Sequence, residues 1–168
     1  MTGARDPNRY VTYEGLRRST SNMFTAEVVS SIQTRNEDPV QDYAKPFWKL
    51  VAEACPEAWA GNTTRTMEDT ETGKTKEEKI KYRIKELVGV ASLARLGGEI
   101  IKNTINDKKY EHKKSISEIM GTYTAKLGQV DWEKEPNNPW MRSQAGFAGQ
   151  KELYSMLYNL VFNDIAPE

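Results

Sequence analysis

The sequence predicts an all-α fold, a single-domain bundle of about five to six helices. Apolar residues recur at three- and four-residue intervals in several segments, which is the spacing of a buried helical face. We find no convincing strand alternation and no internal repeat. The 168 residues, with four Trp, eight Tyr and four Phe, are enough to bury a core without a disulfide or a metal.

The chain begins with a polar segment that we expect to be an irregular tail. This tail covers residues 1–18 and contains Pro7 and Gly15, and the helical domain is expected over 19–168. A first helix is predicted over about 20–34, because Ser and Thr residues that can cap a helix precede a run of spaced apolar residues.

The next helix start is marked by Asp38 followed by Pro39. A carboxylate can cap the helix, and the proline ring presets φ at the first helical position. Pro46 and Pro56 interrupt the apolar pattern that follows, so each should kink this helix or begin a new one. Residues 61–76, rich in Gly, Asn and Thr, are predicted to form an exposed loop.

The strongest helical pattern runs over about residues 76–105. Its apolar stripe contains Ile80, Ile84, Leu87, Val88, Ala91, Ala94, Ile101 and Ile105. The pair Gly97-Gly98 inside it predicts a close helix contact, a kink or a break. We expect Leu87 here and Leu157 in the last helix to be core residues, so aspartate at either position should unfold the domain.

Two further helices are predicted in the C-terminal third. One covers 115–127, where Ser115 and Glu118 have capping-box spacing and Gly128 can end the helix. The other covers 149–165.

The sequence contains no complete catalytic, cofactor or metal site. The single His112 lies in a charged segment, and the single Cys55 lies on an apolar helical face. An enzyme would need a carboxylate pair such as Asp131 and Glu135 in a pocket, which the spacing does not demand. We therefore expect a non-enzymatic protein without a cofactor.

The composition also bounds location and partners. Met1 is not followed by a signal peptide, and no apolar run is long enough to span a membrane. One cysteine cannot form an internal disulfide, which is typical of the reducing cytoplasm. Lys plus Arg and Asp plus Glu number 24 each, so binding to nucleic acid by net charge alone is not expected.

Two local clusters of basic residues remain as candidates for a phosphate-binding face. One contains Lys74, Lys76, Lys79, Lys81, Arg83 and Lys85, and the other contains Lys108, Lys109, Lys113 and Lys114. If the fold brings them together, they would contact a nucleic acid backbone. The alternative is a solvated surface, because acidic residues interleave with both clusters.

The segment 131–149 is irregular and aromatic. It holds Trp132, Trp140 and Arg142, and loops of this kind usually serve recognition or packing. The alternative to recognition is a cap over the end of the bundle, with both indole rings in the core.

Four blocks of the sequence resemble one known family. They are RSTSNMFTAEVV at 18–29, FWKLVAEACPEAW at 47–59, SLARLG at 92–97 and VDWEKEPNNPWMRSQAGFAG at 130–149. In this order they are similar to the C-terminal region of DGQHR-domain proteins, which include the DNA-sulfur-modification regulator DndB. The resemblance covers about residues 18–160.

The chain also departs from that family. Glu86 lies where a His is often found, and Glu133-Lys134 replaces a Ser-Arg pair. The DGQHR signature, which belongs to the N-terminal, ParB-like part, is absent. We therefore expect either a piece of a longer protein or a free-standing relative of the helical half.

The resemblance implies a binding module in DNA-modification-linked regulation or in bacterial or phage defence, with duplex DNA as partner. The expected DNA contacts are Lys79, Lys81, Arg83, Lys85, Lys108, Lys109, Lys113, Lys114, Arg142 and Asn138, with Asn137 and Gln144 as further polar readers. The alternative is a protein–protein interaction module that docks on a partner or on itself, through the tail and the Trp-rich loop.

Overall fold

The computed structural model describes residues 13–69, 73–107, 113–141 and 146–167. Its helices in chain order are α1 (Tyr13–Ser21), α2 (Ala26–Thr34), the π-helix η1 (Pro39–Ala44), α3 (Lys45–Ala54), α4 (Pro56–Ala60), α5 (Leu87–Asn106), α6 (Lys113–Thr124), the 3₁₀-helices η2 (Ala125–Gln129) and η3 (Pro139–Met141), and α7 (Phe147–Asn163). Strands β1 (Thr64–Glu68) and β2 (Thr75–Lys79) form one antiparallel sheet. The fold is thus predominantly helical, and the purely all-α prediction needs this correction.

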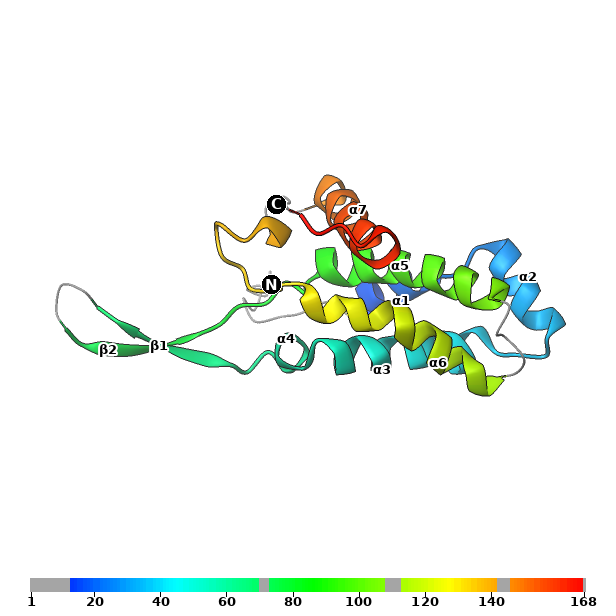
Figure 1. Cartoon of the computed structure of the whole chain (residues 1–168), viewed down its shortest axis with the longest axis horizontal. Coiled ribbons are helices and arrows are strands. Elements are labelled where there is room, and N and C mark those ends of the chain that lie inside the picture. The colour runs from blue at the N-terminus through cyan, green and yellow to red at the C-terminus, as the bar shows by residue number, and fades with distance from the viewer. Residues whose placement is uncertain (1–12, 70–72, 108–112, 142–145, 168) are drawn as a thin grey trace, which may run out of the picture.

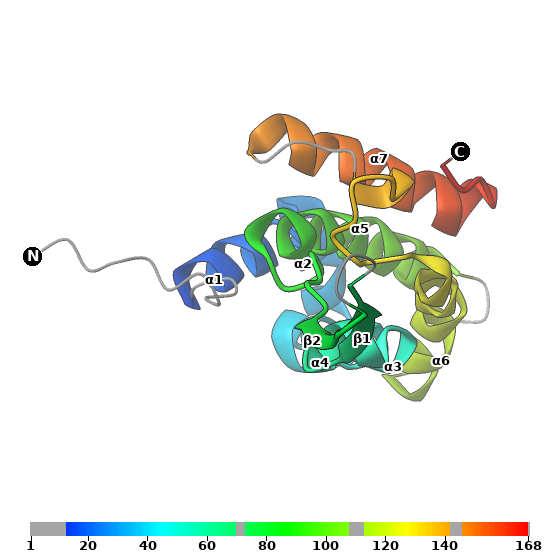
Figure 2. The same ribbon diagram turned by 90° about the vertical axis from the view of Figure 1, so that its left-hand side faces the viewer.

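Helix α5 lies at the centre of the bundle. Figures 1 and 2 both place it between α7 on one side and the layer of α3 and α4 on the other. Its side chains at Leu93, Leu96 and Ile100 have no exposed surface, and it also packs against α1, α2 and α6. The sequence predicts that this helix and α7 supply most of the buried core, but Tyr43, Phe47 and Met120, on η1, α3 and α6, are buried just as fully, so the core is shared among more helices.

Gly97 allows the close packing of α5 on its neighbours. A Cβ atom at this position would lie 2.6 Å from Cε of Met23 and 3.0 Å from the ring of Phe47. The helix continues without a break through Gly97-Gly98. Of the three outcomes predicted for this pair, the structure shows the close helix contact.

The segment predicted as an exposed loop and as the start of a long helix is a β-hairpin. Thr64 pairs with Lys79 and Glu68 with Thr75 in the antiparallel register. Every residue of both strands is exposed, so neither strand shows the apolar alternation by which a half-buried strand is recognised. As a result α5 begins at Leu87 rather than near residue 76.

The N-terminal third begins its helices differently from the prediction. α1 starts inside the predicted tail, and Glu14 forms ion pairs with Arg17 and Arg18 in it. These contacts hold the pKa of Glu14 at about 2. Of the predicted helix over 20–34, residues 20–21 end α1 and only Ala26–Thr34 form α2, because the chain turns between them and Thr25 caps α2 by accepting a hydrogen bond from the Val28 N–H.

The helix start at Asp38-Pro39 is confirmed. The Asp38 carboxylate accepts hydrogen bonds from the backbone N–H groups of Val40 and Gln41. The π-helix η1 begins at Pro39, and α3 and α4 then begin one residue before Pro46 and at Pro56, respectively. The two interruptions of the apolar pattern therefore mark new helices.

The C-terminal third agrees with the prediction in its helices but not in their ends. α6 begins at Lys113, so Ser115 and Glu118 lie within the helix rather than at its predicted start. Gly128 does not end a helix as predicted, because it lies inside the 3₁₀-helix η2. Trp132 and Trp140 are 3% and 5% exposed, which confirms that both rings pack into the core.

The two leucines predicted to be core residues differ in burial. Leu157 has no exposed surface, whereas Leu87 is 51% exposed at the first position of α5, so the prediction for Leu87 was wrong. We expect Leu157→Ala to lower the free energy of unfolding by about 2–5 kcal/mol. Leu87→Ala should change it by less than about 0.5 kcal/mol, and urea denaturation of both variants checks this. Equal losses would contradict the observed start of α5.

Candidate functional site

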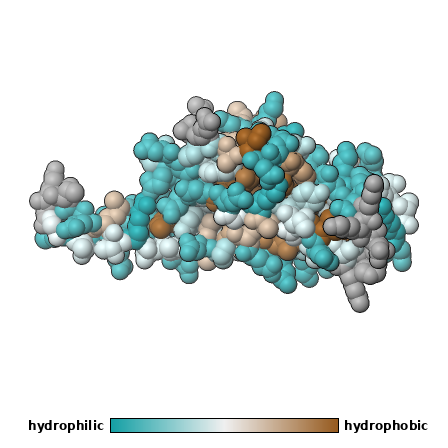
Figure 3. Space-filling model, in the orientation of Figure 1, coloured by the Kyte–Doolittle hydropathy of each residue, from teal (hydrophilic) through white to brown (hydrophobic). Residues whose placement is uncertain are grey.

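Strands β1 and β2 form a β-arm that projects from one end of the helical bundle, at the left of Figure 1. The arm makes no substantial packing contact with any helix, and its ten strand residues are all exposed. Figure 3 shows that its surface is mainly hydrophilic. The arm therefore contributes little to the core, and the bundle does not need it to bury its apolar residues.

The base of the β-arm is held by residues 131–141, the Trp-rich loop, which contains Trp132 and Trp140. Tyr82 forms an isolated antiparallel bridge with Glu133. The backbone N–H of Arg83 donates to the carbonyl of Trp132 over 3.0 Å, and that of Lys134 donates to the carbonyl of Lys81 over 2.8 Å. Because Trp132 is buried in the core, this pairing holds the chain that leaves β2 in a defined position.

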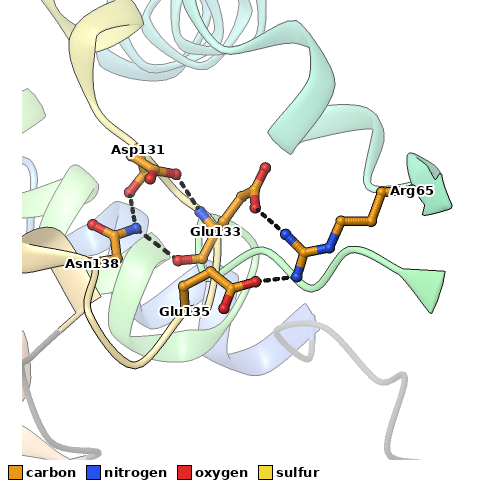
Figure 4. A network of polar contacts seen from close by, with 5 residues as sticks. All are labelled: Arg65, Asp131, Glu133, Glu135 and Asn138. Carbon is orange, nitrogen blue, oxygen red and sulfur yellow. Dashed lines mark hydrogen bonds and ion pairs between the residues drawn. The ribbon is translucent and has the colours of Figure 1, made fainter. Parts of the chain in front are cut away.

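A network of side chains ties β1 to the same loop (Figure 4). Arg65 forms ion pairs with Glu133, at 3.4 Å between Nη1 and Oε2, and with Glu135. Glu135 is the main cause of a pKa for Arg65 above its ordinary value. The Asp131 carboxylate in turn accepts a hydrogen bond from the Glu133 N–H. These acidic residues therefore hold the arm in place, and Glu135 is engaged by Arg65 rather than paired with Asp131.

Asn138 organises the Trp-rich loop from within. Its side chain is buried and donates to the carbonyls of Asp131 and Glu133, while its Oδ1 accepts from the Trp140 N–H. All these partners lie in the loop itself. The predicted contact between Asn138 and DNA gains no support from this placement.

The first predicted basic cluster divides into outward and inward members. Lys79 and Lys81 are exposed, and no ion pair among the described residues involves them. The Arg83 side chain is only 13% exposed, with Nε 3.9 Å from a Glu86 oxygen. The amino group of Lys85 lies 5.8 Å from the centre of the Trp59 ring. Only part of this cluster therefore faces solvent.

The second predicted cluster lies mostly outside the described residues. Lys108, Lys109 and Arg142, together with His112 and Gln144, lie outside the described residues, and only the backbone of Lys113 and Lys114 is described. α5 separates the two clusters in the chain (Figure 1). With 20 residues and a rise of 1.5 Å per residue, it is roughly 30 Å long. The described start of α6, at Lys113, therefore lies at the far end of α5 from the first cluster.

The charges of the β-arm are mixed. Its described residues include four bases, Arg65, Lys74, Lys76 and Lys79, and four acids, Glu68, Asp69, Glu77 and Glu78. The register places Lys76 on one face, opposite Met67, and Lys79 on the other face, opposite Thr64. Neither face of the ribbon is a basic surface.

A pocket of about 280 Å³ lies beside the base of the arm, between α4 and the Trp-rich loop. Cys55 and Trp132 line it, and the Cys55 thiol donates to the Leu127 carbonyl at 3.3 Å. Burial raises the pKa of this thiol to about 11, although the neighbouring Trp132 side chain acts in the opposite direction. Cys55 is thus a buried apolar-type residue and not an activated nucleophile.

Comparison of the chain with protein-family models, with curated proteins and with solved structures yields no match. Among the described residues, no group of three or more His, Cys, Asp or Glu side chains is arranged to hold a metal ion. None of the described helices combines the length and hydrophobicity needed to cross a bilayer. Function must therefore be argued from the surfaces themselves.

The buried thiol gives a test of the packing beneath the arm. At pH 8 we expect Cys55 in the folded chain to react with a thiol-specific disulfide reagent at least ~100-fold more slowly than in the urea-unfolded chain, because its raised pKa leaves little thiolate. Absorbance of the released thiolate gives both rates. Comparable rates would show that the pocket wall opens readily.

Proposed function

We propose that this chain is a non-enzymatic binding module that docks on a protein partner through its β-arm. The observation that carries this is the exposure of every strand residue in a two-stranded ribbon that makes no substantial packing contact with a helix. Such a ribbon is marginally stable alone, and its open edges present unpaired backbone donors and acceptors. A partner strand added to an edge, or a surface laid on one face, would satisfy those groups.

The chemistry of the arm favours a protein over a nucleic acid as its main partner. The basic and acidic groups among its described residues are equal in number, whereas a phosphate-binding arm would carry an excess of Lys and Arg. Met67, 47% exposed, supplies an apolar contact on one face of the ribbon, and the threonines of both strands supply hydroxyl groups on the other face. The ion pairs from Arg65 to the loop preorganise the arm, which lowers the entropy lost on binding.

The choice of partner rests on the sequence resemblance to the helical half of DGQHR-domain proteins. The residues that carry the resemblance lie together although they are far apart in the chain. Gly97 approaches Met23 and Phe47, and Cys55 neighbours Trp132. On this basis the partner that we propose is a DGQHR-type N-terminal domain or a second copy of the chain, in a system linked to DNA modification or defence in the cytoplasm.

Removal of the arm tests the docking function. We replace residues 64–79 by a short Gly-Ser turn and expect an unchanged helical circular dichroism signal. Affinity for a separately supplied DGQHR-type N-terminal domain, or self-association, should fall at least ~10-fold, measured by light scattering and calorimetry. Lys151→Ala, an exposed change on α7, is the matched control. An armless chain that associates like the original would refute the proposal.

Duplex DNA is a second candidate partner, favoured by Lys79 and Lys81. Both are exposed near the base of the arm and form no ion pair among the described residues. Binding to a duplex should then weaken with salt, and the double change to Glu should lower the salt slope by about 2. Mobility shifts at ~50 and ~200 mM salt measure this, with Lys151→Glu as control. Absent or salt-insensitive binding would exclude a phosphate-contacting surface.

A further inference from the structure

A groove of about 550 Å³ runs along α3 on the flank of the bundle. It is lined by Gln41, Lys45, Lys49 and Glu53, by Pro46 and Leu50, and by Ser117 of α6. None of these residues belongs to the β-arm or to its base. The groove is therefore a separate surface from the proposed docking arm.

The spacing of the lining residues defines the shape of the groove. Gln41, Lys45, Lys49 and Glu53 follow one another at four-residue intervals, so they lie along one side of η1 and α3. Pro46 and Leu50 form a second row at the same interval and give the groove an apolar floor. Twelve residues at 1.5 Å per residue amount to roughly 18 Å, which matches about three turns of a partner helix.

The wall of the groove carries positive charge at the end nearer η1. Lys45 is exposed and forms no ion pair among the described residues. The Lys49 amino group is 3.7 Å from a Glu53 oxygen, but its side chain is 77% exposed, so solvent screens that pair strongly. Two ammonium groups one helical turn apart thus remain available to acidic groups of a ligand, and Glu53 marks the opposite end.

We propose that this groove receives an amphipathic helical segment of a partner protein that carries acidic residues beside its apolar face. The apolar side chains of the segment would cover Pro46 and Leu50, as in other helix-in-groove complexes. Its carboxylates, spaced by four residues, would lie against Lys45 and Lys49, where complementary charges fix the register and the direction of the helix. A simple anion would satisfy the lysines but leave the apolar floor uncovered.

The probe for this proposal is a pair of capped 15-residue helical peptides. Both carry Leu along one face, and one has two Glu at a spacing of four residues beside the Leu face where the other has two Lys. We expect the Glu peptide to shift backbone amide resonances of residues 41–53 and of Ser117 in the ¹⁵N-labelled chain. Fluorescence anisotropy should show binding of this peptide at least ~10-fold tighter than that of the Lys peptide.

A charge reversal provides the decisive comparison. The double variant Lys45→Glu, Lys49→Glu should lose at least ~10-fold in affinity for the Glu peptide and gain affinity for the Lys peptide. Lys102→Glu, Lys151→Glu, two exposed changes outside the groove, is the matched control and should leave both affinities unchanged.

Three results would overturn the proposal. They are resonance shifts confined to other surfaces, equal affinity for the two peptides, and displacement of the Glu peptide by an equimolar duplex DNA that shifts the same resonances. The last would reassign the groove to nucleic acid. Because the resonance mapping uses the unaltered chain, it stands even if the double variant folds poorly.

Discussion

The close approach of α5 to its neighbours is the constraint on which the rest of the structure depends. At three glycines of this helix, Gly89, Gly97 and Gly98, an added Cβ would lie less than 3.0 Å from a neighbouring atom. A Cβ at Gly97 would meet Met23 and Phe47, and a Cβ at Gly89 would lie 2.3 Å from the carbonyl oxygen of Arg83. The first contact sets the distance between α5 and the N-terminal helices. The second fixes the start of α5 against the segment that leads from the β-arm, so the placement of the arm follows from the packing of the core.

The parts of the fold that could be predicted from the sequence are those whose residues face a core on one side and water on the other. α7 is an example, because Leu153, Leu157 and Leu160 recur at helical spacing and are buried. The β-arm could not be found in this way, since both of its faces are exposed. The helical pattern extends back to about residue 76, within β2, because Ile80 and Ile84 keep the spacing, and the same spacing places the exposed Leu87 in the core.

The candidate site was less accessible from the sequence than the fold. Arg65 contacts Glu133 across 68 positions in the chain, and no local pattern signals an ion pair over that separation. The resemblance suggests Asn138 as a residue that contacts DNA bases, but its amide forms hydrogen bonds within the loop that anchors the arm. The alternative reading of that loop, a cap with both indole rings in the core, describes it correctly. The only local signal is that Glu133 and Glu135 lie close to Trp132 in the sequence. Two carboxylates in one loop can hold a basic residue from elsewhere in the chain.

The structure separates the residues that stabilise it from those available for binding. The core is formed by the helices, whereas the β-arm and the rim of the groove consist of exposed polar side chains on a rigid support. The chain runs from α3, which forms the wall of the groove, through α4 directly into β1. The two surfaces are thus joined by a short, folded connection rather than a flexible linker. A ligand that contacts both would lose little further entropy at the second surface.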